Sequence, residues 1–250
     1  FTRVEYCART GQWHALLQEC SSQYPNHPQS IYQINRALCH TGTLLDRMFL
    51  YSQQFGQNSL VLHSEQNLTT PLVRSDFYFD LGNFNEALHW TYEAVSVNGL
   101  TVWNLQRLTL INLLYRQTEL AEKYLNRLSA TIIGRKWAEH YRPYLEKDAD
   151  LSRDRVLATM KKREVKNHYL TFIYMPKQEF INILKGNPEN QFAFEYLTAF
   201  YLLGKNIEKL ESLWEKAPAA LKTKMPRYYQ EAILYLALRN PGVQTENIQP

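Results

Sequence analysis

The sequence LVRSDFYFDLGNFNEALHWTYEAV, residues 72–95, contains two amphipathic segments of helix length that are joined at Gly82-Asn83. A Gly-Asn pair is typical of the left-handed turn that ends one helix before the next begins. Ala87 and Ala94 share one stripe of the second segment, where two antiparallel helices need small side chains to pack closely. The stretch therefore predicts a helical hairpin whose turn depends on a left-handed Gly82.

This hairpin resembles one tetratricopeptide repeat, a helix–turn–helix unit of about 34 residues. A shift of one such repeat from Gly82 reaches Arg116, and the same shift places Ala121 on Ala87. The next hairpin is therefore predicted to turn at Arg116, with residues 118–128 as its second helix. Because Arg116 stands where the first hairpin has glycine, the sequence defines this turn less well than the turn at Gly82.

Single glycines also mark helix ends elsewhere in the chain. Gly11 and Gly42 are predicted to end the first helices of two earlier hairpins, and Gly204 to end a late one. The spacing between Gly42 and Gly82 is longer than one repeat because residues 54–70 are polar and loop-like. The expected helices around these turns include residues 44–53, 135–147, 154–166, 191–203 and 226–238.

These patterns predict an all-α fold of tetratricopeptide-like helical hairpins, stacked as an α-α superhelix (solenoid) that is less regular in its second half. Residues 1–128 are expected to form the regular hairpins. Residues 129–250 are expected to form an irregular helical continuation with a late repeat-like hairpin and a capping helix.

Charge is distributed unevenly along the chain, although the formal net charge is only +4. Residues 1–100 carry 5 Lys or Arg against 8 Asp or Glu, whereas residues 151–250 carry 15 against 10. Much of the basic excess lies between Arg153 and Lys166, a run that could touch phosphates. No aromatic residue is interleaved with it for stacking on bases, so a solvated helix face is the simpler interpretation and no nucleic-acid partner is expected.

Patterns that would identify an enzyme or a metalloprotein are weak. The seven histidines form no His-Glu-x-x-His motif, and the three cysteines form no Cys-x-x-Cys pair. Asp76 and Asp80 have the spacing of two carboxylates on one helix face, but exposed acids at this spacing are common. We therefore expect no catalytic residues, no metal and no cofactor in this segment.

Helical repeat stacks usually bind ligands along the concave surface formed by their first helices. The repeat register places several aromatic, charged and polar side chains on that surface. They are Tyr32, Arg36, His40, Asp76, Phe79, Asp80, Gln106 and Tyr201. Aromatic anchors beside a few charges are typical of peptide-binding grooves. The alternative is that the aromatic residues are core and that Arg36 and Asp76 merely pair between adjacent repeats.

Motifs spread over most of the chain are also similar to one family as a whole. They are Arg9-Thr10-Gly11-Gln12-Trp13, Asn35-Arg36-Ala37-Leu38 with Gly42, Asp46-Arg47-Met48-Phe49, Arg135-Lys136-Trp137-Ala138 and Ala193-Phe194-Glu195-Tyr196-Leu197. Together they resemble the C-terminal soluble region of an uncharacterised family of multi-span bacterial membrane proteins. The resemblance implies a piece of an inner-membrane protein of the bacterial cell envelope, on the periplasmic rather than the cytoplasmic side.

The sequence itself contains no run near the roughly 18 uninterrupted apolar residues that a membrane span requires. We therefore expect the extramembrane part of a larger envelope protein, adjoining the membrane region of the full-length chain and binding a protein or peptide partner. The alternative is an accessory or substrate-positioning domain of a membrane enzyme whose chemistry lies outside this segment. Neither interpretation identifies the partner.

Overall fold

The computed structural model describes residues 2–21, 27–61, 70–166, 175–222 and 225–239. Within these residues the expectation of an all-α fold is confirmed, because every regular element is a helix. The chain divides into two compact units: unit 1 comprises Phe1–His63 and Tyr169–Pro250, and unit 2 comprises Ser64–His168. The boundary expected at residue 128 lies where the repeat pattern in the sequence weakens. These two units are defined by contacts in space, so they do not test that boundary.

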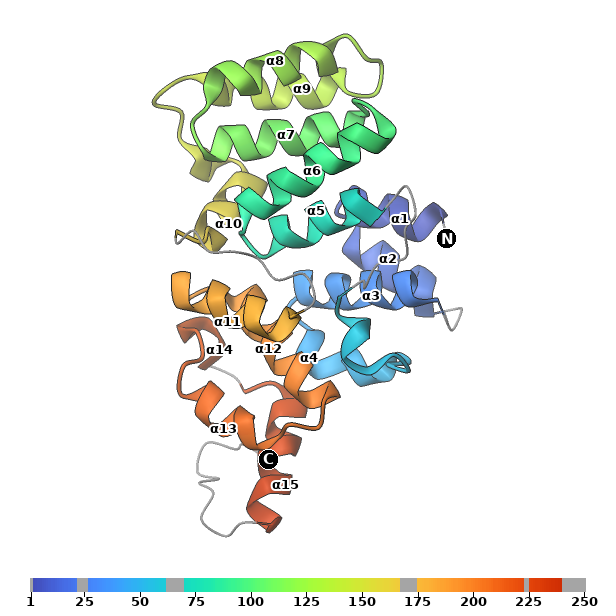
Figure 1. Ribbon diagram of the computed structural model, residues 1–250, viewed down its shortest axis with the longest axis vertical. Helices are drawn as coiled ribbons and strands as arrows, with labels where there is room; N and C mark the ends of the chain where they lie inside the picture. Colours follow the sequence, from blue (N-terminus) through green and yellow to red (C-terminus); the bar gives the residue numbers. More distant parts are fainter. Residues whose placement is uncertain (1, 22–26, 62–69, 167–174, 223–224, 240–250) are drawn as a thin grey trace. The chain divides into compact units, whose positions relative to one another are not determined.

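Unit 2 consists of helices that pack one on the next in chain order (Figure 1). Two hairpins come first: α5 (Thr70–Asp80) with α6 (Phe84–Asn98), and α7 (Val102–Leu114) with α8 (Thr118–Ser129). They are followed by α9 (Arg135–Tyr141), the 3₁₀ turns η3 (Arg142–Leu145) and η4 (Leu151–Arg153), and α10 (Arg155–Arg163). Helix α9 packs on α8, and α10 returns to pack on α5 and α7.

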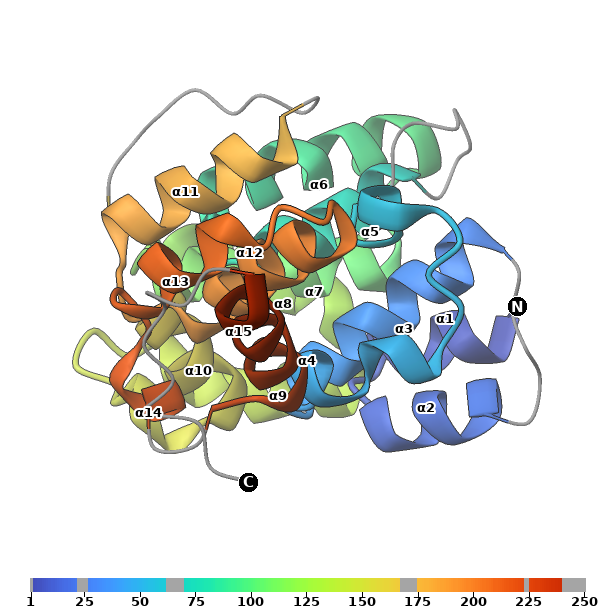
Figure 2. The same cartoon turned by 90° about the horizontal axis from the view of Figure 1, so that it is seen from below.

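Unit 1 joins the two ends of the chain. Its N-terminal part contains α1 (Thr2–Arg9), α2 (Trp13–Ser21), α3 (Pro28–His40), α4 (Leu44–Arg47) and the 3₁₀ turns η1 (Met48–Leu50) and η2 (Gly56–Ser59). Its C-terminal part contains α11 (Pro176–Gly186), α12 (Gln191–Leu203), α13 (Glu208–Trp214), α14 (Ala219–Lys222) and α15 (Arg227–Arg239). Helix α12 packs on α3 and α4, and α15 packs on α4 (Figures 1 and 2), so segments far apart in sequence share one core.

Five hairpins reverse through the same turn, with one left-handed residue each: Gly11, Gly42, Gly82, Arg116 and Lys205. Their φ angles lie between 55° and 78°. Each left-handed residue donates its N–H to the carbonyl three residues back at 3.0–3.4 Å, and the following residue donates to the carbonyl five back at 2.8–3.0 Å. This is the Schellman arrangement, which pairs carbonyls that the ending helix would otherwise leave without partners. The predicted left-handed Gly82 is confirmed, and Arg116 adopts the same conformation without being glycine.

Small side chains bring α5 and α6 together, as the sequence predicts. Ala87 and Ala94 are completely buried on α6. The hydroxyl of Ser75 on α5 lies 2.7 Å from the hydroxyl of Thr91, which itself donates to the Ala87 carbonyl at 2.6 Å. These buried hydroxyls are hydrogen-bonded, so the close approach of the two helices leaves no unsatisfied polar group at this point.

Two expected helix limits are wrong in informative ways, whereas the expected helix 191–203 with its end at Gly204 is confirmed. The helix expected over 44–53 ends at Arg47, and the helix expected over 135–147 ends at Tyr141, just before a 3₁₀ turn that contains Pro143. In the late hairpin the left-handed residue is Lys205 rather than Gly204. A Cβ at Gly204 would lie 2.2 Å from the side-chain amide nitrogen of Gln57, so a larger residue would displace that side chain, whereas the φ of −84° does not require glycine.

Candidate functional site

Three of the predicted groove residues of unit 1 lie on α3, and two of these three are buried. Tyr32 is 1% exposed and Arg36 is 2% exposed. The Arg36 guanidinium lies over the rings of Trp13 and Tyr32, at 5.4 and 5.9 Å from their centroids. Arg36 also donates to the side-chain carbonyl of Gln33 at 2.9 Å. Arg36 is therefore held by stacking and hydrogen bonding inside its own unit, where a peptide would not reach it.

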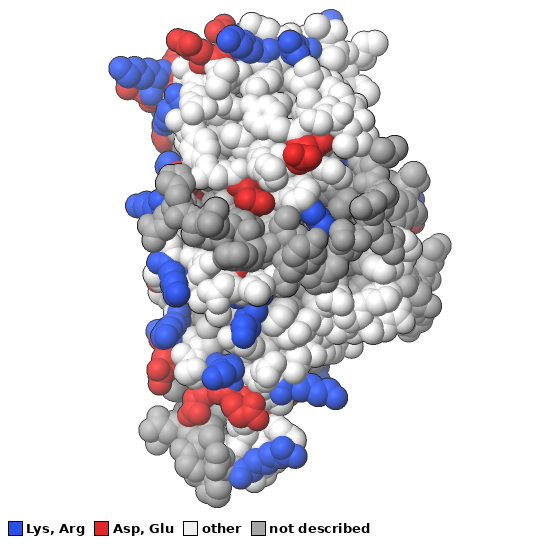
Figure 3. All heavy atoms as spheres, in the orientation of Figure 1, with Lys and Arg blue, Asp and Glu red and all other residues white. Residues whose placement is uncertain are grey.

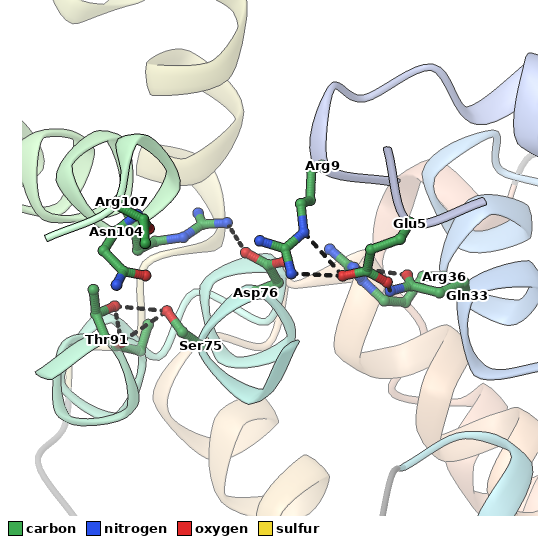
Figure 4. Close-up of polar contacts among 11 residues, drawn as sticks. Glu5, Arg9, Gln33, Arg36, Ser75, Asp76, Thr91, Asn104 and Arg107 are labelled. Carbon is green, nitrogen blue, oxygen red and sulfur yellow. Dashed lines mark hydrogen bonds and ion pairs between the residues drawn. The ribbon is translucent and has the colours of Figure 1, made fainter. Parts of the chain in front are cut away.

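A polar network extends from Gln33 to α1 (Figure 4). One carboxylate oxygen of Glu5 accepts hydrogen bonds from the amides of Gln29 at 3.2 Å and Gln33 at 3.3 Å. Its other oxygen pairs with Arg9 at 2.8 Å. Because these groups satisfy one another at low exposure, the network fixes α1 against α3 and is structural in this conformation.

His40, the third predicted residue on α3, belongs to an aromatic stack. Its ring lies parallel to that of Trp13, with 4.1 Å between centroids and 6° between planes. The edge of Phe192 from α12 meets it at 5.1 Å. His40 thus connects α2 and α12 to α3, which is the role of a packed core histidine.

In unit 2, Asp76 pairs with Arg107 from α7 at 2.5 Å, and both side chains are largely buried. The same guanidinium lies 3.7 Å over the ring of Phe79, which also packs on Phe84 at 5.5 Å between centroids. Phe79 is only 3% exposed, and Asp80 only 4%. The expectation that Phe79 anchors a ligand in an open groove is therefore wrong, because Arg107 and Phe84 cover its ring.

The two remaining groove residues, Gln106 on α7 and Tyr201 on α12, are half-buried. Burial raises the pKa of Tyr201 above its usual value, so its phenol is neutral and can donate a hydrogen bond. The predicted residues fall into both compact units. A continuous groove through all of them therefore stays a prediction, as does the pairing of Arg36 with Asp76.

Sequence reasoning did not predict a surface crevice that lies in unit 1 between α2, α3 and the segment after α4. Its volume is about 210 Å³. The lining residues are Cys20, Ser21, Ile31, Ile34, Arg47, Leu50, Tyr51 and Ser52. Ile31 and Ile34 are completely buried behind this lining, whereas Leu50 is 62% exposed and offers an accessible apolar side chain at the rim.

The wall of this crevice exists because the α-helix ends at Arg47 and the chain becomes extended after the 3₁₀ turn Met48–Leu50. Tyr51 is extended, with φ −112° and ψ 150°. The buried amide of Asn35 exchanges hydrogen bonds with Gln53 at 3.1 Å in both directions and donates to the Ser59 carbonyl at 3.0 Å. Asn35 therefore positions the segment that carries Leu50 and Tyr51. The structure buries Asn35 completely, and the sequence signal that could have indicated this role is an asparagine directly after Ile34 in a helix with several apolar residues.

Two lining residues, Cys20 and Arg47, determine the reactivity and the charge of the crevice. Burial, with a smaller contribution from Glu19, raises the pKa of Cys20 to about 11, so the thiol is protonated and a poor nucleophile at neutral pH. Arg47 is exposed and supplies a permanent positive charge at the side of the crevice. Among the described residues, no group of three or more His, Cys, Asp or Glu side chains is placed to hold a metal ion.

The basic run between Arg153 and Lys166 is partly structural. Arg163 donates to the Asp80 carbonyl at 3.1 Å, and Lys161 pairs with Glu164 at 2.6 Å. On the face drawn in Figure 3, Lys and Arg side chains of the described residues lie in small groups with acidic side chains among them. This distribution gives no support to a nucleic-acid surface on that face.

A second polar cluster joins α9 to α10. Asp154 caps α10 by accepting the N–H of Leu157 at 2.8 Å, and it also contacts His140 at 2.9 Å and the hydroxyl of Tyr141 at 3.4 Å. Burial, together with the neighbouring Asp154, raises the pKa of Tyr141. The cap explains why this aspartate is buried, since it satisfies a helix N-terminus.

The chain belongs to a family of unknown function (DUF6057). The model of that family matches residues 1–249. No curated protein and no solved structure matches significantly. None of the described helices has the length and apolar character that crossing a bilayer requires.

Proposed function

We propose that this member of DUF6057 is a protein-binding helical-repeat domain that holds a peptide segment of a partner at the crevice beside Arg47. The repeated Schellman turn supports the repeat character. The same two hydrogen bonds recur after Gly11, Gly42, Gly82, Arg116 and Lys205, although only three of these residues are glycine. A turn that recurs without its usual residue indicates that hairpin geometry, rather than local sequence, is the shared feature.

The dimensions of the crevice favour a peptide side chain over a small-molecule ligand. Pockets for drug-sized ligands usually measure about 300–1,000 Å³. At about 210 Å³, this crevice suits a single large apolar side chain, which would pack against the exposed Leu50. Interfaces between proteins commonly depend on one such anchor in a pocket. This fit is the observation that carries the proposal.

The rim adds a preference for charge. Arg47 is exposed beside the crevice, so a carboxylate next to the apolar anchor of the partner would meet a guanidinium that can bind it bidentately. Leu50, and Phe49 at 45% exposure, extend the apolar surface outside the opening. The preferred segment therefore carries a Leu-, Met- or Phe-sized residue beside an acidic residue or a free C-terminus.

We further propose that the domain is the extramembrane part of a larger bacterial envelope protein, on the periplasmic side. The motif Arg9-Thr10-Gly11-Gln12-Trp13 contributes to the resemblance behind this part of the proposal, and it forms the first hairpin turn. The domain would present its crevice to a protein partner and would perform no chemistry of its own.

The test is site-specific photo-crosslinking in cells that express the full-length protein. A benzophenone amino acid replaces Leu50 at the rim, or Ser96 on the exposed side of α6 as the matched control. We expect a defined partner to be crosslinked from residue 50 but not from residue 96, and Arg47→Glu to reduce the yield at least fivefold. Equal yields at both positions, or a yield that Arg47→Glu leaves unchanged, would refute the crevice as the binding site.

A further inference from the structure

The loop between α8 and α9 exposes two adjacent isoleucines. Ile132 is 93% exposed and Ile133 is 79% exposed, and Ile132 is the most exposed large apolar residue among those described. Most large apolar side chains of unit 2 are buried, and Leu128, only four residues earlier, is completely so. The pair therefore lies just after a well-packed helix end and does not belong to the core.

Hydrogen bonds hold this loop in one shape. The N–H and hydroxyl of Thr131 both donate to the Leu128 carbonyl, at 2.9 and 2.8 Å. The Thr131 hydroxyl oxygen accepts the N–H of Gly134 at 2.9 Å, and the Thr131 carbonyl accepts the N–H of Arg135 at 3.2 Å. A Cβ on Gly134 would lie 2.5 Å from that hydroxyl oxygen, so only glycine fits here. The two isoleucines are thus presented on an ordered turn, which lowers the entropy cost of binding through them.

The residues nearest the loop carry an excess of positive charge. Residues 123–138 contain four cations, Lys123, Arg127, Arg135 and Lys136, and no acidic residue. All four are exposed. Arg142 adds a fifth cation near the end of α8, where it donates to the side chains of Asn126 at 3.0 Å and Ser129 at 3.2 Å. Glu122 and Glu139 flank this stretch and are also exposed, so the five cations near the apolar tip outnumber the two acids beside them.

We propose that the Ile132–Ile133 loop inserts into the surface of a bilayer rich in anionic phospholipid. Its isoleucines enter the acyl-chain boundary, and Arg127, Arg135 and Lys136 meet the phosphates. Apolar tips flanked by Lys and Arg bind membranes through the sum of apolar burial and attraction to anionic lipid. A stable protein interface needs about 20–30 residues on each side, which a two-residue tip does not supply.

The expected strength follows from the two contributions. Inserting one isoleucine side chain favours binding roughly tenfold or more, and each cation near an anionic surface adds about fivefold. Binding of the bilayer through this one loop is therefore reversible. Its role would be to orient the domain at a membrane to which the rest of a larger protein is attached. This inference is independent of the crevice and of any partner that binds there.

The experiment is co-sedimentation of the full 250-residue chain with vesicles of phosphatidylglycerol and phosphatidylethanolamine in equal parts, against vesicles of phosphatidylcholine alone. We expect binding to the first kind only. Ile132→Ser with Ile133→Ser should weaken it at least tenfold, and Arg127→Gln with Lys136→Gln at least fivefold. The matched controls are Leu238→Ser, which removes another apolar side chain that is 87% exposed, and Lys177→Gln with Lys185→Gln, and they should bind normally.

Insertion is then measured directly with Ile133→Cys carrying an environment-sensitive dye, since the native Cys7, Cys20 and Cys39 are buried. A blue shift and quenching by brominated acyl chains are expected with anionic vesicles. The proposal is overturned if the unmodified chain does not bind them, or if the double serine variant binds as well as the unmodified chain. It is equally overturned if the serine changes abolish self-association instead, which would make the loop an interface between copies of the chain.

Discussion

Replacing Gly82 with alanine should test both why this residue is glycine and how α10 returns to the first hairpin of unit 2. At Gly82 φ is +78°, a conformation that costs an alanine about 1–2 kcal/mol. A Cβ here would also lie 2.0 Å from the carbonyl oxygen of Arg163 and 2.5 Å from its carbonyl carbon. Both atoms belong to the backbone, so no side-chain rotation can relieve the contact.

The second effect can be estimated from the bonds that hold the returning segment. The N–H of Val165 donates to the Gly82 carbonyl at 3.1 Å, and Arg163 donates to the Asp80 carbonyl at 3.1 Å. Moving residues 163–165 away would break the first bond, worth about 1 kcal/mol, and the charged second one, worth about 1.5–3 kcal/mol. The close approach should therefore cost roughly 2–4 kcal/mol in addition to the strain in φ.

Gly42→Ala is the matched control, because Gly42 has φ +66° in the same kind of turn and nothing within 4 Å of its Cβ position. Denaturant unfolding should show a loss of about 1–2 kcal/mol for Gly42→Ala and of about 3–6 kcal/mol for Gly82→Ala. Hydrogen exchange should also show that Gly82→Ala removes the protection of the Val165 amide. If both variants lose the same stability, or if Val165 stays protected, residues 163–165 do not pack on this turn and the reasoning is refuted.

Three further predictions concern the turns, the buried ion pair and the phenols. Arg116→Val should be at least about 1 kcal/mol less stable than Arg116→Gly in denaturant unfolding, because Arg116 has φ +59° and a β-branched residue fits that region poorly. Asp76→Asn should cost about 3–5 kcal/mol by leaving the Arg107 charge buried, and adding Arg107→Leu should recover part of that loss in a double-mutant cycle. Burial raises the pKa of Tyr115 and of Tyr124 to about 12, so the folded state holds these protons more tightly than the unfolded state does. The stabilisation from these phenols is complete below pH 10 and is lost between pH 10 and 12. Tyrosinate absorbance would measure the two pKa values, and unfolding at several pH values would measure the loss of stability.

The sequence predicts well what depends on neighbouring residues. Gly82 ends its helix in the left-handed conformation, and Ala87 and Ala94 are buried at a close helix contact, because turn and stripe are encoded within about fifteen residues. Arg116 extends this result. The turn at Arg116 lies where the repeat spacing places it, although a non-glycine residue prefers a negative φ. The hairpin context therefore determines a conformation that arginine alone would avoid.

What the sequence does not predict depends on segments that are distant along the chain. Phe79 has the helical position of a groove residue, but Arg107, which lies 28 residues later, covers its ring. The crevice depends on an amide pair between Asn35 and Gln53 that interrupts an otherwise plausible helix. The exposed Ile132 resembles any core isoleucine until the packing of α8 and α9 leaves it outside. Helical periodicity specifies a face relative to one hairpin, and only tertiary packing determines whether that face meets a neighbour or solvent.

The two proposed surfaces can be separated by experiment because they lie on different units of the chain. Arg47 and Leu50 line the crevice of unit 1, whereas Ile132 and Ile133 form the exposed loop of unit 2. Arg47→Glu should therefore reduce crosslinking from residue 50 without changing vesicle binding by the purified chain. The double serine variant of the loop should weaken vesicle binding by the purified chain. In the full-length protein it should leave crosslinking from residue 50 unchanged, provided that other parts of that protein keep it at the membrane. If either variant abolished both activities, the two surfaces would not be independent, and a loss of folding or a single shared site would have to replace the two-surface proposal.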